Sequence, residues 1–137
     1  MSHYNTVRTE FRDRALLVAS LEAVGFKPLT SDIAQALTGF ENDRRPQTAE
    51  VIVPRKQVGA LSNDIGFKRQ PDGSFAAVIS DYDREKYGKK WLGRLKLEYG
   101  VARVTRLARM KYGCAKPVVK KIQTPTGPKT VVKFVLP

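Results

Sequence analysis

The 137-residue sequence contains one cysteine, Cys114, and one histidine, His3. One cysteine excludes an internal disulfide, and a reducing compartment is its simplest setting. One histidine, third in the chain, gives little basis for histidine-centred acid–base pairs or triads, and a packed terminal imidazole is its simpler role. No run of about 18 apolar residues occurs, and the charged N-terminus lacks the apolar centre of a signal peptide. We therefore expect a soluble cytoplasmic protein with no membrane span.

Acidic residues are absent after Glu98. Residues 1–85 carry 11 basic and 12 acidic residues, a net charge of −1, whereas residues 86–137 carry 14 basic residues and one acidic residue, a net charge of +13, which together give the net charge of +12. No linker or internal repeat separates the parts. We predict one domain, 1–137, with a neutral part and a strongly basic part. A segregated surplus of this size favours an acidic partner: nucleic acid, an anionic membrane or an acidic protein.

Motifs for enzyme chemistry are also missing. No glycine-rich phosphate-binding pattern is present, and "PDGS" and "PTGP" are typical of turns. Cys114 lies near several lysines, which favour its thiolate, but no partner base is evident. Asp81, Asp83 and Glu85 alternate in "DYDRE", a possible metal cluster. Two simpler explanations are that acids before a helix complement its positive end, or that they pair with Arg84 or Lys89. We predict a protein that is not an enzyme, with no catalytic residues, no metal site and no cofactor.

Residues 13–24 form the clearest predicted helix, because their apolar side chains recur at helical spacing. Asp13 suits the N-cap, and Gly25 followed by Phe26 suits a Schellman ending. In the polar stretch that follows, "SDIAQAL" is predicted as a short helix and "ENDRRPQT" as a loop.

Strands are predicted on both sides of this stretch. "YNTVRTEF" alternates weakly and suits a short edge strand, and residues 49–54 form a strand that Pro54 ends. Two hairpins follow, one at 64–80 around the turn "PDG" and one at 117–137 around a turn rich in proline and glycine. The order predicts the α+β fold class: a single domain with a mostly antiparallel sheet built from two hairpins plus an edge strand, and with helices packed on the sheet.

The basic segment between the hairpins has two apolar faces if it is one straight helix turning about 100° per residue. One face carries Trp91, Leu92, Leu95, Tyr99 and Ala102. The other, roughly opposite, carries Val101, Val104, Ala108 and Tyr112. A straight helix on one sheet could not bury both faces without burying arginines. We therefore predict two helical segments, 86–99 and 101–112, that meet at a bend or break near Gly100.

Arg103, Arg106 and Arg109 follow at three-residue spacing and form a ridge about 10 Å long on a helix. Guanidinium groups suit phosphate oxygens, although a solvated helix face is the simpler alternative. Tyr87 and Tyr112, at the ends of the segment, are candidates for stacking on bases, whereas core packing explains the other aromatic residues of the segment. The predicted nucleic-acid-binding residues are Lys89, Lys90, Arg94, Lys96, Arg103, Arg106, Arg109, Lys111, Lys116, Lys120, Lys121 and Tyr112.

The stretches "MSHY", "DIGFKRQPDGSF" and "ISDYDREKYGKKWLGRLKLEYGV" resemble a domain-of-unknown-function family. That family includes a hypothetical chloroplast reading frame of algal plastids and cyanobacteria, and it has bacteriophage relatives. The resemblance covers nearly the whole chain and is most specific over residues 64–101; residues 27–48 and the lysine-rich tail depart from it. It implies a single α+β domain and a phage, cyanobacterial or plastid setting, hence the plastid stroma or a host cytoplasm as further locations. It transfers no catalytic residues.

Two functions follow from these patterns. The first is a small basic, non-enzymatic protein that contacts nucleic acid through the basic helix and the C-terminal hairpin. RNA and low sequence specificity are favoured, because no helix-turn-helix, zinc finger or aromatic ribonucleoprotein motif is present. The alternative is an accessory or inhibitory protein, phage-encoded in one of those settings, that docks its basic face on an acidic protein partner.

Overall fold

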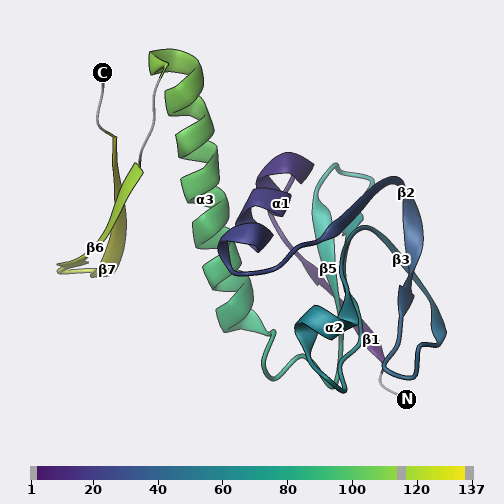
Figure 1. The fold of residues 1–137 in the computed structure, drawn as a ribbon. Helices are drawn as coiled ribbons and strands as arrows, with labels where there is room; N and C mark the ends of the chain where they lie inside the picture. Colours follow the sequence, from purple (N-terminus) through teal and green to yellow (C-terminus); the bar gives the residue numbers. More distant parts are fainter. Residues whose placement is uncertain (1–2, 114–116, 135–137) are drawn as a thin grey trace.

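The computed structural model describes residues 3–113 and 117–134, which form an α+β fold (Figure 1). Five antiparallel strands form one sheet in the order β1-β5-β4-β3-β2. These strands are β1 (Tyr4–Arg8), β2 (Leu29–Thr38), β3 (Arg44–Val53), β4 (Ile65–Arg69) and β5 (Phe75–Ser80). The helices are α1 (Arg14–Ala23), α2 (Arg55–Val58) and α3 (Lys89–Tyr112). Strands β6 (Pro117–Thr124) and β7 (Gly127–Phe134) pair as a separate hairpin.

Helix α1 begins and ends as its sequence predicts. Asp13 is the N-cap, and its side chain accepts a hydrogen bond of 3.0 Å from the backbone N–H of Leu16. At the other end Gly25 has φ 98°, and the N–H of Phe26 donates to the carbonyl oxygen of Leu21 at 2.9 Å. This is the Schellman arrangement, in which a left-handed glycine lets the chain turn back over the last helical carbonyls.

The main core lies on the face of the five-stranded sheet that α1 and α3 cover (Figure 1). Its fully buried side chains include Phe67 and Phe75 from the sheet, Leu17 and Leu21 from α1, and Leu95 from α3. Burial of one such side chain stabilises the fold by roughly 1.5–3 kcal/mol. Helix α3 is therefore fixed to the domain by its N-terminal half.

Strands β2 and β3 correct the prediction for the polar stretch. The expected short helix in "SDIAQAL" is part of β2, and most of the expected loop "ENDRRPQT" lies in β3. Ile33 and Leu37 have the spacing of one helix face, yet Leu37 is fully buried and Ile33 is 76% exposed. The pairing of β2 with β3 shifts register between Thr30 and Gln35, so strict alternation is lost. Tertiary pairing decides the structure here, which local periodicity does not reveal.

Helix α3 corrects the prediction of a break. It runs without interruption from Lys89 to Tyr112, and Gly100 lies inside it. One side packs against the core through Trp91 and Leu95. The opposite side carries Leu97, Val101, Val104 and Ala108, since a helix turns about 100° per residue. Figure 1 shows the hairpin on that side, and α3 contacts β7. One continuous helix can carry both apolar faces because it lies between the main core and the β6–β7 hairpin. The prediction placed all strands in a single sheet and so left the second face without a partner.

The C-terminal hairpin is confirmed as a hairpin but not as part of the main sheet. Its two strands pair only with each other among the residues that the structure describes. The second hairpin of the five-stranded sheet is instead β2–β3. Helix α3 and the β6–β7 hairpin, which we call the α3–hairpin unit (residues 89–113 and 117–134), form one side of the molecule in Figure 1.

Candidate functional site

The predicted binding residues that the structure describes all lie in the α3–hairpin unit, and all of them are exposed. Helix α3 carries Lys89, Lys90, Arg94, Lys96, Arg103, Arg106, Arg109, Lys111 and Tyr112, and strand β6 carries Lys120 and Lys121. Two residues singled out in the sequence, Lys116 and Cys114, lie outside the described residues. The exposed cations circle the helix, so the structure forms a basic projection and not one flat basic face.

Two of the predicted cations have acidic partners. The ammonium group of Lys96 lies 3.2 Å from a carboxylate oxygen of Glu10, and a guanidinium nitrogen of Arg106 donates to Asp13 at 2.8 Å. This hydrogen bond from Arg106 is the main reason that the pKa of Asp13 lies below its ordinary value. The other predicted cations form no salt bridge within the described part of the chain. Most of the positive charge is therefore not neutralised internally.

The arginine ridge lies where α3 extends past the main core. Tyr99 packs against the main core, and its hydroxyl oxygen accepts hydrogen bonds from the backbone N–H groups of Arg12 and Asp13. Two turns later Arg106 points in nearly the same direction and reaches Asp13. Arg103 and Arg109 stand on either side of it and remain exposed. The direction in which Trp91 and Tyr99 pack against the core is thus open to solvent near the helix end.

The hairpin register adds two lysines that the predicted site did not include. Across the strands, Val118 faces Lys133, Lys120 faces Val131, and Ile122 faces Lys129. Residues directly opposite each other share one face of an antiparallel pair. Lys129 and Lys133 therefore lie on the same face as Lys120. The sequences "VVKKI" and "KTVVK" show which residues alternate along each strand. Only the register between the strands shows that Lys120, Lys129 and Lys133 share one face.

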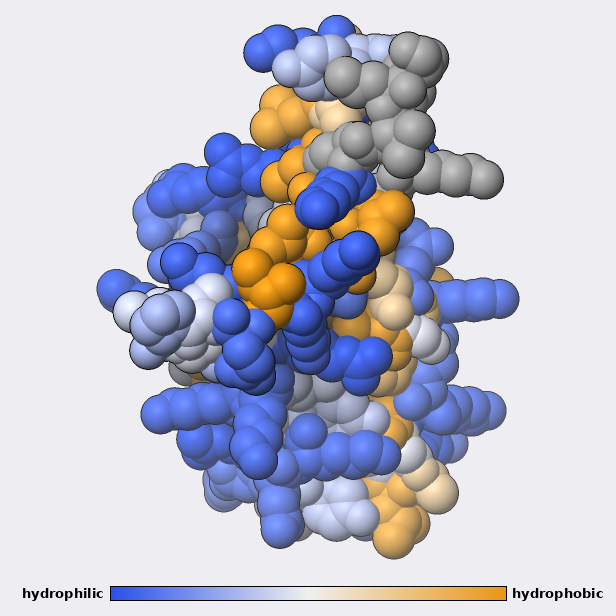
Figure 2. Space-filling view, turned by 90° about the vertical axis from the view of Figure 1, so that its left-hand side faces the viewer, coloured by the Kyte–Doolittle hydropathy of each residue, from blue (hydrophilic) through white to orange (hydrophobic). Residues whose placement is uncertain are grey.

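Hydrophobic side chains are exposed on the same unit. They are Val104, Leu107, Met110 and Tyr112 on α3, and Val118, Val119 and Ile122 on β6. Figure 2 views this side of the molecule and shows hydrophobic side chains between hydrophilic ones. Large contiguous apolar patches on a protein surface are typical of interaction sites. Here cationic and apolar groups are interleaved.

Of the two stacking candidates, only Tyr112 keeps its ring accessible. Tyr87 is buried, and its hydroxyl group donates to the carbonyl oxygen of Val58 at 2.9 Å, so its prediction as a stacking residue is wrong. Tyr112 is half-exposed, and the ammonium group of Lys111 lies 5.6 Å from the centre of its ring. Trp91 packs edge-to-face on the ring of Tyr87 at 5.2 Å in the core, as core packing predicts.

Two acids of "DYDRE" have polar partners in the structure, and Asp81 lies 3.9 Å from a guanidinium nitrogen of Arg84, one of the partners that the sequence suggested. Asp83 is buried and accepts hydrogen bonds from the backbone N–H of Asn63 and the hydroxyl group of Ser80, at 3.1 and 2.8 Å. Because α3 begins only at Lys89, with no acid in its first turn, the expected complement to the helix start is not formed. No group of three acidic, histidine or cysteine side chains in residues 3–113 and 117–134 is arranged to hold a metal ion. His3 is exposed, which corrects the expectation of a packed imidazole.

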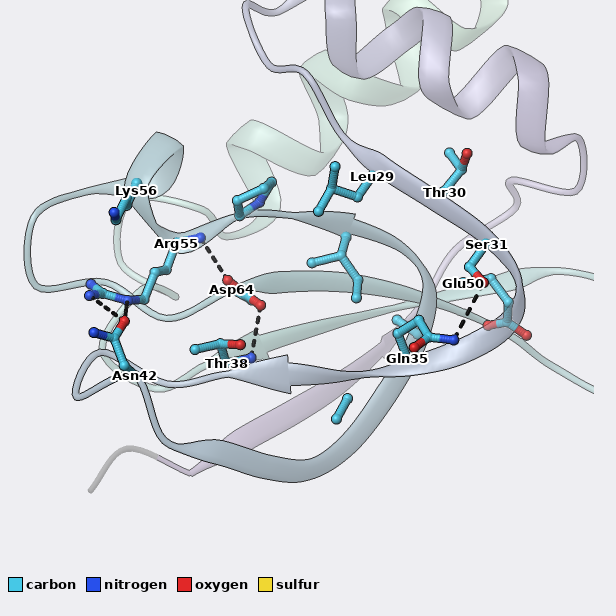
Figure 3. Close-up of a pocket in the computed structure, with 14 residues that line it drawn as sticks. Leu29, Thr30, Ser31, Gln35, Thr38, Asn42, Glu50, Arg55, Lys56 and Asp64 are labelled. Atoms are coloured by element: carbon cyan, nitrogen blue, oxygen red, sulfur yellow. Dashed lines mark hydrogen bonds between the residues drawn. The ribbon is translucent and has the colours of Figure 1, made fainter.

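A second candidate site is a pocket of about 350 Å³ between β2, β3 and α2 (Figure 3). Its acids have structural partners. Asp64 accepts hydrogen bonds from the backbone N–H groups of Thr38 and Arg55, at 2.8 and 2.7 Å, and Glu50 accepts one from the backbone N–H of Arg69 at 3.0 Å. The guanidinium group of Arg55 donates to the side-chain oxygen of Asn42. Burial raises the pKa of Asp64. The charged residues of the lining, Arg55, Lys56, Glu50 and Asp64, balance in sign, so the pocket does not select a ligand by charge.

No protein-family model, curated protein or solved structure matches the chain. The family resemblance stays a prediction, and a functional proposal has to rest on the site itself. None of the helices that the structure describes is both long enough and apolar enough to cross a membrane.

Proposed function

We propose that this protein is a non-enzymatic nucleic-acid-binding protein that contacts phosphate groups through its α3–hairpin unit. One observation carries the proposal: a projecting helix and hairpin hold exposed cations, of which only Lys96 and Arg106 have acidic partners in the described part of the chain. Cations that neutralise phosphates release condensed counterions, and this release drives binding without reading a base sequence. Low sequence specificity is therefore expected. The preference for RNA remains a prediction from the absence of DNA-binding motifs.

An acidic protein partner is the second candidate function. The exposed side chains of Leu107 and Met110, 54% and 77% accessible, favour it because apolar anchors carry much of the affinity at protein interfaces. In that case the lysines and arginines would set the association rate and the choice of partner. Nucleic acid ranks first because the surplus of charge extends over the helix and both strands of the hairpin.

The salt dependence of binding tests the first function. If about five phosphates are contacted, log K falls against log salt with a slope of roughly −4 to −5 on duplex DNA. Fluorescence anisotropy with labelled DNA and RNA measures this slope. A flat response between about 50 and 200 mM salt, or no binding to either nucleic acid, would favour the acidic protein partner.

Replacement of Arg103, Arg106 and Arg109 by glutamine tests whether the arginine ridge is part of the phosphate-binding surface. The salt slope should become shallower by about two to three units, nearer two because Arg106 is already paired with Asp13. The melting temperature should move by only a few degrees, since exposed substitutions each cost about 0.5 kcal/mol or less.

The matched control replaces three exposed cations of the neutral part, Lys27, Arg44 and Lys56, by glutamine. This control removes the same charge and should leave the slope nearly unchanged. Equal losses from both triple variants would mean diffuse attraction without a site. An unfolded arginine variant would mean that the ridge is structural.

A further inference from the structure

On one face of the β6–β7 hairpin, lysine and aliphatic side chains alternate both along each strand and across the two strands. This mixed face consists of Val118, Lys120 and Ile122 on β6 and Lys129, Val131 and Lys133 on β7. Each of its three cross-strand pairs joins one lysine to one branched aliphatic residue, and the lysine changes strand from one pair to the next. All six residues are exposed except Val131, which is half-buried. The lysines thus zigzag along the ribbon with aliphatic groups between them.

The dimensions of this face match a nucleic-acid groove. Val118 and Ile122 are about 13 Å apart along the strand, which corresponds to about four steps of 3.4 Å along a nucleic-acid strand. The two strands lie about 4.8 Å apart, so lysines from alternate strands extend toward both edges of the ribbon. A two-stranded ribbon fits the major groove of B-form DNA, which is about 12 Å wide. The lysines would then meet phosphates on both walls, and the aliphatic groups would face base edges and thymine methyl groups.

We propose that the mixed face enters the major groove of B-form duplex DNA, an inference that rests on the nucleic-acid binding proposed above. The A-form RNA duplex does not fit, because its major groove is too narrow and deep for such a ribbon. This proposal therefore opposes the RNA preference expected from the sequence. A second copy of the chain is a poor occupant, because two lysine-bearing faces repel each other.

The first test compares three probes of equal length: a DNA duplex, an RNA duplex of the same sequence and the single-stranded RNA. The full chain is titrated with each probe at about 100 mM salt. We expect the DNA duplex to bind about tenfold or more tightly than either RNA probe. Equal binding of all three probes would overturn groove entry and leave the proposed function intact. No binding to any of them, with binding to polyglutamate, would overturn both.

The second test changes the aliphatic groups without changing charge or branching. Threonine replaces Val118, Ile122 and Val131 together, which keeps the β-branched shape that favours a strand. We expect affinity for the DNA duplex to fall about fivefold or more, because each replacement exchanges an apolar methyl or ethyl group for a polar hydroxyl group, while the salt slope stays the same.

The matched control lies on the other face of the same hairpin, where Val119 and Val132 are directly opposite. Their replacement by threonine should change the affinity less than about twofold. Circular dichroism of both variants checks that the hairpin remains folded. Equal losses from the two faces, or no loss from the mixed-face variant, would contradict groove entry.

Discussion

Asp13 links the start of α1 to α3. Its carboxylate accepts hydrogen bonds from Leu16 in α1 and from Arg106 in α3, while its backbone N–H donates to the hydroxyl group of Tyr99. The cap on α1 is predictable from sequence, because its partners are three residues apart. The pair with Arg106 spans 93 residues and becomes visible only when α1 and α3 are packed together. Local chemistry was therefore predicted, and the long-range use of the same carboxylate was not.

Replacement of Asp13 by alanine should cost about 1–2 kcal/mol, since it removes the N-cap and the partner of Arg106. Replacement of Arg106 by glutamine should cost less than about 1 kcal/mol, because the pair is partly exposed. Thermal unfolding of the two single variants and the double variant gives the coupling between these residues. A coupling of zero would mean that the pair contributes nothing to the fold.

The lowered pKa of Asp13 also predicts a pH dependence. A depressed carboxyl pKa contributes stability above the unfolded value of about 3.9, and this contribution is lost as the pH falls through the folded pKa. In the Arg106→Gln variant we expect the pKa of Asp13, measured by NMR titration, to rise toward its ordinary value. An unchanged pKa would assign the shift to the α1 backbone instead of to Arg106.

Helix α3 has two apolar sides, of which one packs against the main core and the other lies toward the β6–β7 hairpin. The sequence predicted both sides correctly from the 3.6-residue period, but it could not show that a separate hairpin lies on the second. The prediction of a break at Gly100 followed from that missing partner. In β2 the error had a similar origin, since a register shift against β3 hides the alternation that would have identified a strand.

Replacement of Gly100 by alanine tests the continuity of α3. A Cβ atom at this position meets nothing within 4 Å, and the residue lies in the helix interior. Alanine should therefore stabilise the protein by about 0.5–1 kcal/mol through its better helix propensity. Chemical denaturation measures the change. A loss of stability would indicate a left-handed glycine and a broken helix.

Gly66 in β4 provides the opposite case. A Cβ atom there would lie 2.8 Å from the Cβ atom of Ala49 and 3.0 Å from a methyl carbon of Leu37. Replacement by alanine should destabilise the fold by about 1–3 kcal/mol, because the side chains of Ala49 in β3 and Leu37 in β2 already fill this space. Unchanged stability on denaturation would show that Leu37 moves aside without cost.

At the scale of the whole molecule, the positive charge is concentrated in the α3–hairpin unit. Turn residues and hairpin patterns were sufficient to predict an α+β fold, and the count of charges located the basic part. Neither could show that the cations surround a projecting helix, that Arg106 is paired, or that the hairpin stands outside the main sheet. These properties depend on contacts between segments far apart in sequence.

Amide chemical-shift mapping tests most directly whether the α3–hairpin unit binds nucleic acid. The full nitrogen-15-labelled chain is titrated with a short DNA duplex, and then with the matching RNA duplex, at low salt. We expect the largest shifts in α3 from Arg103 onward and in β6 and β7, with little change in β2 and β3. Shifts concentrated around the pocket between β2 and β3, or no shifts with either duplex, would contradict the proposed function.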